Sequence, residues 1–526
     1  MTNKYLYITL LAVLGFNTET QAQQQAGGQS PRLVVSIAID QLRSDYLEAF
    51  APLYSDKGFR RLLSEGLVYP NANYPFAPID RASAIATLCT GTTPYYNSIV
   101  GQQWLNRQTL RPVWCVDDKA FEGIGTTDGT SPKQLVTSTV GDELKVATDG
   151  KANVYAIAPS RDAAVLFGGH AANAAVWIDD REGYWCTSQY YTNGMPVWLQ
   201  VANNEQAPAN HIDDMTWEPV NELVGNFSYF MHTGLQKPFK HRFSGPRRFE
   251  AFKASALVNS SITDLATQCI VNTGMGNDRV TDMLCLTYYA GNYDHRTLTE
   301  CRIELQDTYV RLDSEIGRLI GFIEERIGID KVLFVVTSTG YNDHETADYQ
   351  KYNVPTGTFY MSRTTNLLNM YLGAIWGQGQ YVEAHFKNHL FLNHKLLEQK
   401  KISIADASNR SQEFLAMLSG VRNVYTSLQL LTTSNDYTQK TRNGFNPERC
   451  GDLLIEIAPG WNLLDEDTQE QEQVCASFVP FPIIFFGANV PSQHVSTPVT
   501  TDRIASTISR AIRIRAPNAC TSEPLF

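Results

Sequence analysis

The chain has 526 residues, of which 43% are hydrophobic, 11% aromatic and 18% charged. This composition excludes a disordered chain, a coiled coil and a small disulfide-held domain, and it allows a large α/β core. The formal net charge is −11, from 43 basic and 54 acidic residues, so nucleic acid is not an expected partner. Nine cysteines are too few for a disulfide framework to hold such a chain together.

The first 22 residues are typical of a secretory signal. Lys4 supplies a positive charge, residues 5–16 are mainly apolar, and Thr20 and Ala22 are small residues before the expected cleavage point. This apolar stretch is shorter than the roughly 20 residues that cross a bilayer, which argues against an uncleaved anchor. We therefore expect a signal peptide over 1–22, a Gln/Gly linker over 23–31, and a mature protein without a membrane span, in the periplasm or at the cell surface.

Apolar, β-branched runs after the linker predict buried parallel strands. The first, residues 33–39, ends on Asp40, and ligands bind at this end of the strands in open α/β sheets. The other expected strands are 154–158, 283–288, 332–337 and 481–487, and the expected helices are 54–65, 82–89 and 300–327.

Strands and helices alternate over most of the chain, which predicts one α/β domain over residues 32–520. The expected architecture is a mostly parallel central sheet with helices on both faces. Residues of about 190–245 and 341–450 interrupt this pattern with aromatic, Asn-rich and helical material. We interpret both segments as cap insertions.

A series of short segments, in this order, resembles the alkaline phosphatase superfamily, in particular bacterial periplasmic single-nucleophile phosphatases and nucleotide pyrophosphatase/phosphodiesterases. The segments are VSIAIDQLRSDY (35–46), GFRRLL (58–63), Pro78 with Thr90-Gly91, GQQW (101–104), SPK (131–133), GDEL (141–144), GHAANA (169–174), DTYVRLD (307–313) and GFNP (444–447). The resemblance covers about residues 32–515 and implies a three-layer α/β/α fold. It also implies chemistry that depends on two zinc ions, a Thr or Ser nucleophile, and polar groups that receive phosphoryl oxygens.

The residues at the functional positions depart from the family pattern. Asp40 matches the first metal ligand, whereas the aligned nucleophile is Arg81, whose guanidinium stays protonated and cannot attack phosphorus. The remaining positions are Gln102 for a family Asn, Ser160 and Asp162 for a phosphate-binding Lys-x-Arg pair, Asn292 and Arg296 for one zinc-binding Asp/His pair, Thr339 and Gly340 for the other, and Pro480 for the last zinc-binding His. One metal ligand of six would therefore survive.

From these departures we expect a catalytically inactive member of the superfamily, a pseudoenzyme that binds an unidentified protein partner in the cell envelope and needs no cofactor. Arg81, Arg161 and Arg296 are candidate anion-binding residues of its cleft. A buried, unpaired carboxylate is costly, so we also expect an arginine, Arg81 before Arg296, to pair with Asp40 where zinc would lie.

An alternative is a zinc-dependent phosphomonoesterase or phosphodiesterase with a rearranged active site. Its candidate residues are Asp40, Asp80, Asp294, His295, Asp343 and His344, with Ser83 or Thr87 as a displaced nucleophile. Metal-free chemistry is a further alternative, without an evident nucleophile and base.

Other candidates have plainer interpretations. We interpret His385 and His389 as residues of an exposed helix face and His170 as structural. The pairings Cys115 with Cys186 and Cys450 with Cys475 stay open.

Overall fold

The computed structural model describes residues 29–224, 238–296, 300–340, 353–433, 435–466, 471–473 and 479–526. The expected signal peptide lies outside these residues. Within them, eleven strands form the central sheet. Their order is β21 (Gln493–His494), β2 (Leu67–Asn73), β20 (Phe481–Gly487), β12 (Val332–Ser338), β1 (Leu33–Asp40), β11 (Asp282–Tyr289), β6 (Val154–Ala158), β7 (Ala174–Ile178), β8 (Trp185–Ser188) and β5 (Gly123–Ile124), with β22 (Val499–Thr500) beside β2.

The middle of the sheet is parallel, as expected. β1 lies between β11 and β12 and runs parallel to both, and β6 and β7 continue in the same direction. The register pairs Asp40 with Tyr289 and Ile39 with Ser338, so the ends of three strands meet at one edge. The late strand β20 is antiparallel to both of its neighbours, β12 and β2.

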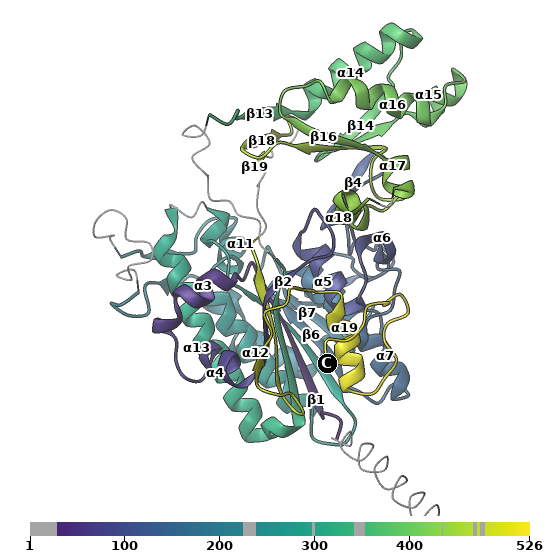
Figure 1. Cartoon of the computed structure of the whole chain (residues 1–526). Coiled ribbons are helices and arrows are strands. Elements are labelled where there is room, and N and C mark those ends of the chain that lie inside the picture. The colour runs from purple at the N-terminus through teal and green to yellow at the C-terminus, as the bar shows by residue number, and fades with distance from the viewer. Residues whose placement is uncertain are drawn as a thin grey trace, which may run out of the picture.

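Alternate residues of β1 supply the two hydrophobic cores. Leu33, Val35 and Ile37 belong to the core on one face of the sheet, whereas Val34 and Ala38 belong to the core on the other. Helices cover both faces in Figure 1, which gives the expected three layers. One face carries α3 (Ser44–Ala49), α4 (Phe59–Glu65), α12 (Leu257–Thr273) and α13 (Arg302–Arg326), and the other carries α5 (Arg81–Thr90), α7 (Val140–Ala147), α8 (Arg161–Gly168) and α19 (Arg503–Ala511).

The expected helix over 54–65 is wrong in its first half, because α4 begins only at Phe59. The carboxylate of Asp313 accepts the backbone N–H groups of Ser55 and Phe59, at 2.8 Å and 2.7 Å, and this holds the segment before the helix in a turn. Gly58 approaches Asp313 so closely that a Cβ would collide with it.

Smaller elements complete the body of the molecule. They are η1 (Ala51–Leu53), α6 (Pro94–Asn97), β3 (Gln103–Asn106), β4 (Arg111–Trp114), α9 (Val197–Glu205), α10 (Pro208–His211), β9 (Thr216–Trp217), β10 (His241–Arg242), α11 (Arg248–Lys253), η3 (Tyr293–His295) and η5 (Ile329–Lys331). No helix in the described ranges is long and apolar enough to cross a membrane.

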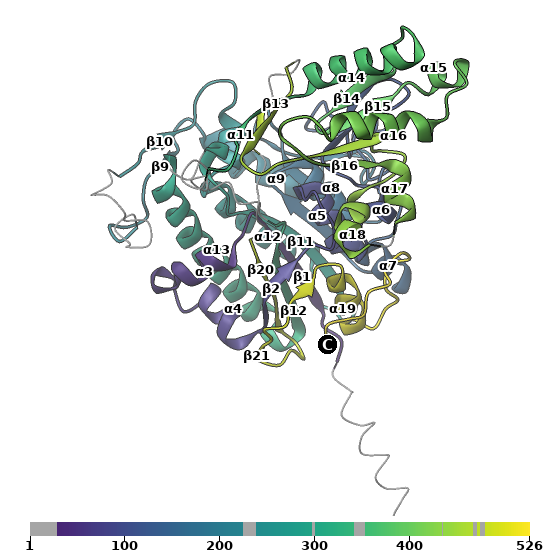
Figure 2. The ribbon, with the colours of Figure 1, turned by 45° about the horizontal axis from the view of Figure 1, so that its top comes forward.

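The described residues between 353 and 473 form a separate layer, here called the cap module, above the carboxyl ends of the central strands (Figures 1 and 2). The cap module has its own hydrophobic core, and Arg107 of the body donates to its Asp452 at 2.9 Å. Its elements are β13 (Gly357–Tyr360), α14 (Met361–Trp376), β14 (Val382–Phe386), β15 (His389–Leu392), α15 (His394–Gln399), α16 (Ile404–Leu415), β16 (Val421–Thr426), α17 (Ser427–Thr432), α18 (Asp436–Gly444), β17 (Leu453–Ile457), β18 (Trp461–Leu464) and β19 (Gln471–Gln473).

His385 and His389 do not share a helix face, so that interpretation is wrong. They lie on the antiparallel strands β14 and β15, which are joined by a tight turn with Lys387 in the left-handed region. Burial lowers the pKa of His389 to about 4, so its imidazole is neutral near pH 7.

Candidate functional site

A cavity of about 750 Å³ lies where four parallel strands, β1, β11, β6 and β7, end. One part of its wall comes from residues at or just after these strand ends: Asp40, 287–289, 159–162 and 179–181. This is the edge at which open α/β sheets bind ligands. The charged side chains of the lining are the cations Arg81, Lys119, Arg161, Arg181, Arg247 and Lys253 and the anions Asp40, Asp117, Asp128, Asp162, Asp179, Asp180, Glu250 and Asp294.

Arg81 enters the cavity because α5 begins there. Asp80 caps this helix: its carboxylate accepts the Ser83 N–H at 2.9 Å, while the Ser83 hydroxyl accepts the Asp80 N–H at 3.1 Å. Asp80 and Ser83 are therefore capping residues. Neither they nor the fully buried Thr87 lines the cavity, so the structure does not support a displaced nucleophile on α5.

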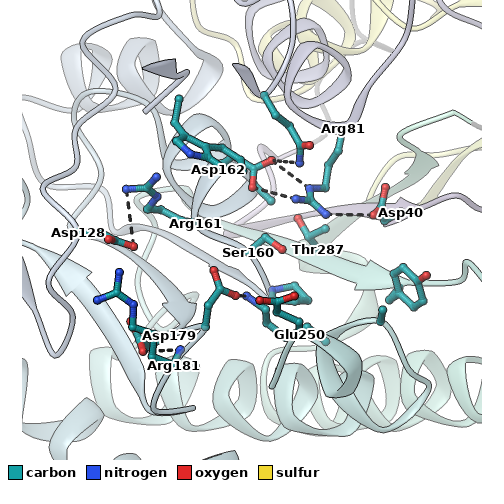
Figure 3. Close-up of a pocket in the computed structure, with 18 of the residues that line it drawn as sticks. Asp40, Arg81, Asp128, Ser160, Arg161, Asp162, Asp179, Arg181, Glu250 and Thr287 are labelled. Carbon is teal, nitrogen blue, oxygen red and sulfur yellow. Dashed lines mark hydrogen bonds and ion pairs between the residues drawn. The ribbon is translucent and has the colours of Figure 1, made fainter. Parts of the chain in front are cut away.

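Arg81 bridges two buried carboxylates (Figure 3). Its Nε and Nη2 lie 3.0 Å from the two oxygens of Asp162, and its Nη1 lies 3.4 Å from Oδ2 of Asp40. The expected ion pair with Asp40 is thus confirmed, although Asp162 is the closer partner. Burial alone would raise the pKa of Asp162, but the charge and hydrogen bonds of Arg81, with a bond from Gln102, hold it below its ordinary value.

Arg161 and Ser160 also line the cavity, at the start of α8. Arg161 donates to Asp117 at 2.8 Å and to Thr130 at 3.2 Å, and its Nη1 lies 3.8 Å from Asp128. Arg161 is a candidate anion-binding residue, but its guanidinium already contacts two carboxylates of the protein, those of Asp117 and Asp128. The Ser160 side chain makes no cap hydrogen bond to α8.

Asp294 and His295 line the same cavity as Asp40. Both have positive φ, 48° and 55°, which is uncommon outside glycine, and both belong to the tight 3-10 turn η3. Burial lowers the pKa of His295, and the charges of Asp40 and Arg81, which act in opposite directions, do not restore it.

Arg296 does not face Asp40, contrary to expectation, and is absent from the cavity lining. Its side chain is 47% exposed, lies over the Tyr293 ring and approaches Asp294 at 3.9 Å. Asn292 donates to the Arg296 carbonyl at 3.0 Å and holds this turn together.

The remaining family positions lie around Asp40 or away from it. The Thr339 hydroxyl donates to Asp40 at 2.6 Å, and Gly340 follows with a φ of 86°. Pro480 is exposed, and its carbonyl accepts the Ser44 N–H at 3.1 Å. Asp343 and His344 lie outside the described residues, so only Asp40, Asp294 and His295 of the rearranged set are seen in the cavity.

The described residues do not fit a two-zinc site. They contain no group of three or more His, Cys, Asp or Glu side chains able to hold a metal ion. A zinc site needs three or four such ligands. In addition, both oxygens of the Asp40 carboxylate are already in contact with other groups, one with Thr339 and the other with Arg81.

Other sequence candidates have structural roles. His170 contacts Asp142 at 2.9 Å and the Leu135 carbonyl at 2.8 Å, outside the cavity. Cys115 and Cys186 are free, buried thiols, so they do not pair, and Cys475 lies outside the described residues.

Comparisons with known proteins agree with this architecture. The family model "Type I phosphodiesterase / nucleotide pyrophosphatase" matches residues 34–477. Alkaline phosphatase PhoV of Synechococcus elongatus is 27% identical over 511 residues, which cover 93% of this chain and 91% of that protein. Alkaline phosphatase PafA of Elizabethkingia meningoseptica is 25% identical over 98% of both chains. The crystal structure of wild-type PafA superposes with a TM-score of 0.81 at 24% identity, covering 95% of this chain and 99% of that one, and confirms the fold.

These similarities contradict two of our expectations. Near full-length similarity to proteins named alkaline phosphatases argues against an inactive binding or scaffold protein. The expectation of no cofactor is also wrong, because the family resemblance that these relatives support implies zinc chemistry. Both expectations judged the site position by position, whereas the similarity extends over nearly the whole chain.

Proposed function

Because the chain belongs to the type I phosphodiesterase/nucleotide pyrophosphatase family, we propose that it hydrolyses phosphoric esters with a rearranged active site in the cavity beside Asp40. The observation that carries the proposal is the family match over residues 34–477, which includes every strand that ends at this cavity. The signal pattern of residues 1–22 supports export.

The proposed reaction is the attack of water on phosphorus, in which the water gives up a proton, the ester P–O bond breaks, and the leaving alkoxide oxygen takes up a proton to become an alcohol. His295 is the candidate group for proton transfer, since its lowered pKa keeps the imidazole neutral near neutral pH. Arg181 is the candidate for binding phosphoryl oxygens: its guanidinium donates to Thr127 at 3.1 Å, and it forms no ion pair with any described carboxylate.

The test is hydrolysis of p-nitrophenyl phosphate and bis(p-nitrophenyl) phosphate by the purified chain, with zinc or magnesium and after chelation. We expect turnover of at least one ester, and a kcat lower by about 10²–10⁴-fold in His295→Asn. The acidic limb of the wild-type pH profile should lie below 6.5, the ordinary histidine pKa.

His211→Asn is the matched control, because this exposed imidazole contacts only a backbone carbonyl and lies outside the cavity. It should hydrolyse esters like the wild type. Failure to hydrolyse both esters under every metal condition would overturn the proposed function, whereas normal turnover by His295→Asn would overturn only the role of His295.

A further inference from the structure

Three elements bring one cation and two anions together at the floor of the cavity. Asp40 is the last residue of β1, Arg81 is the first residue of α5, and Asp162 is the second residue of α8. The side chains of Asp40 and Asp162 are 9% and 6% exposed, and that of Arg81 is 22% exposed. All three charges are therefore largely withdrawn from water, where an uncompensated ion is costly.

Described donors contact both oxygens of each carboxylate. Thr339 donates to the Asp40 oxygen that does not face Arg81, and Gln102 donates to Asp162 at 3.2 Å. Arg81 makes a bidentate contact with Asp162 and a weaker contact with Asp40. Burial alone would lower the pKa of Arg81, but the two carboxylates raise it above the ordinary value. The guanidinium is the only cation within ion-pair distance of either carboxylate among the described residues.

Two buried carboxylates that reach one small volume are the ligands that a hard divalent cation prefers. A metal ion bound to either carboxylate would stand about 2.0–2.2 Å from its oxygens, where the contacting guanidinium nitrogens of Arg81 now lie at 3.0 Å and 3.4 Å. Its positive charge would also be repelled by Arg81.

We infer that the Arg81 guanidinium is the built-in cation of this site, and that it holds the position between Asp40 and Asp162 that a divalent metal ion would otherwise occupy. Any metal that this chain uses is then bound by other residues. The inference goes beyond the proposed function, because its test counts bound metal and gives an answer whether or not esters are hydrolysed.

The test is equilibrium dialysis of the purified chain against zinc and, separately, magnesium, followed by elemental analysis. We expect Arg81→Ala to bind one more equivalent of metal than the wild type, and Arg81→Ala combined with Asp162→Asn to lose that equivalent. Arg161→Ala, which removes another arginine of the same cavity, should gain none.

Asp162→Asn in the otherwise natural chain should leave the metal content unchanged, and this comparison does not require Arg81→Ala to fold. If Asp162→Asn removes an equivalent from the natural chain, metal and not Arg81 occupies the position. If folded Arg81→Ala binds no more metal than the wild type, the two carboxylates do not form a cation position. Either result overturns the inference.

Discussion

Replacing Arg81 by Met would leave Asp40 and Asp162 buried without their shared cation. The substitution removes two 3.0 Å contacts and one 3.4 Å contact while keeping much of the side-chain volume. Loss of one member of a buried ion cluster costs about 3–5 kcal/mol, because the remaining charges stay uncompensated. We expect that decrease in the free energy of unfolding at pH 7, measured by urea denaturation.

The size of the loss should depend on pH, and the pKa of Asp162 gives the sign. Arg81 lowers this pKa below 3.8, so the pair stabilises the fold above that pH and the contribution disappears as the pH falls through the lowered value. Without Arg81, burial raises the pKa of Asp162, and protonation of this carboxyl group relieves the cost. Arg81→Met should therefore approach wild-type stability only as the pH falls below 3.8, where the wild type loses the contribution of the pair.

Arg161→Met is the matched control, because its partners Asp117 and Asp128 are 42% and 41% exposed. Ion pairs with such exposed partners contribute about 0–1 kcal/mol. The reasoning fails if Arg81→Met loses no more than Arg161→Met at pH 7, or if its loss is equally large in acid.

Two further predictions concern the scaffold. Burial lowers the pKa of His170, but its contacts with Asp142 and Leu135 raise this pKa overall above 6.5. His170→Gln should therefore lose more stability at about pH 5.5 than at about pH 8.5 in the same urea assay. Equal losses at the two pH values would contradict a charged pair. Gly58→Ala should lower the free energy of unfolding by about 1–3 kcal/mol, because the methyl group would collide with Asp313. Gly321 lies on the exposed face of α13, and no atom lies within 4 Å of a Cβ added there. Gly321→Ala should therefore raise the free energy of unfolding by about 1 kcal/mol. Equal effects of the two substitutions would refute the collision at Gly58.

Much of the central sheet could be predicted from the sequence because its strands are buried on both faces. The runs 154–158 and 481–487 coincide with β6 and β20, and the run that ends on Asp40 coincides with β1. The direction of β20 could not be predicted, since a continuous apolar run pairs equally well in either direction. The alternation around His385 and His389 was missed because their four-residue spacing also fits a helix.

The candidate site was only partly predictable, because its contacts join distant segments. Asp40 was identified from its place at a strand end, and its pairing with Arg81 followed from the cost of a lone buried carboxylate. The closer partner, Asp162, lies 81 residues beyond Arg81 and was considered only as a lost phosphate-binding position. The rule that identified Asp40 would have identified it, since Asp162 follows the apolar strand that ends at Ala158.

The position of β1 in the sheet also constrains how the chain is made. β1 ends at residue 40, yet one of its two partner strands, β12, ends at residue 338. At roughly 5–20 residues per second, the ribosome needs roughly 15–60 s to add the 298 residues between these ends (338 − 40 = 298). During that time an eight-residue strand that is wholly buried in the folded protein lacks at least one of its two neighbours, and it is open to aggregation or to the protection of a chaperone. Closure of the sheet is consequently a late event that involves most of the chain, and β1, which is synthesised before both of its partners, is among the last strands to be enclosed.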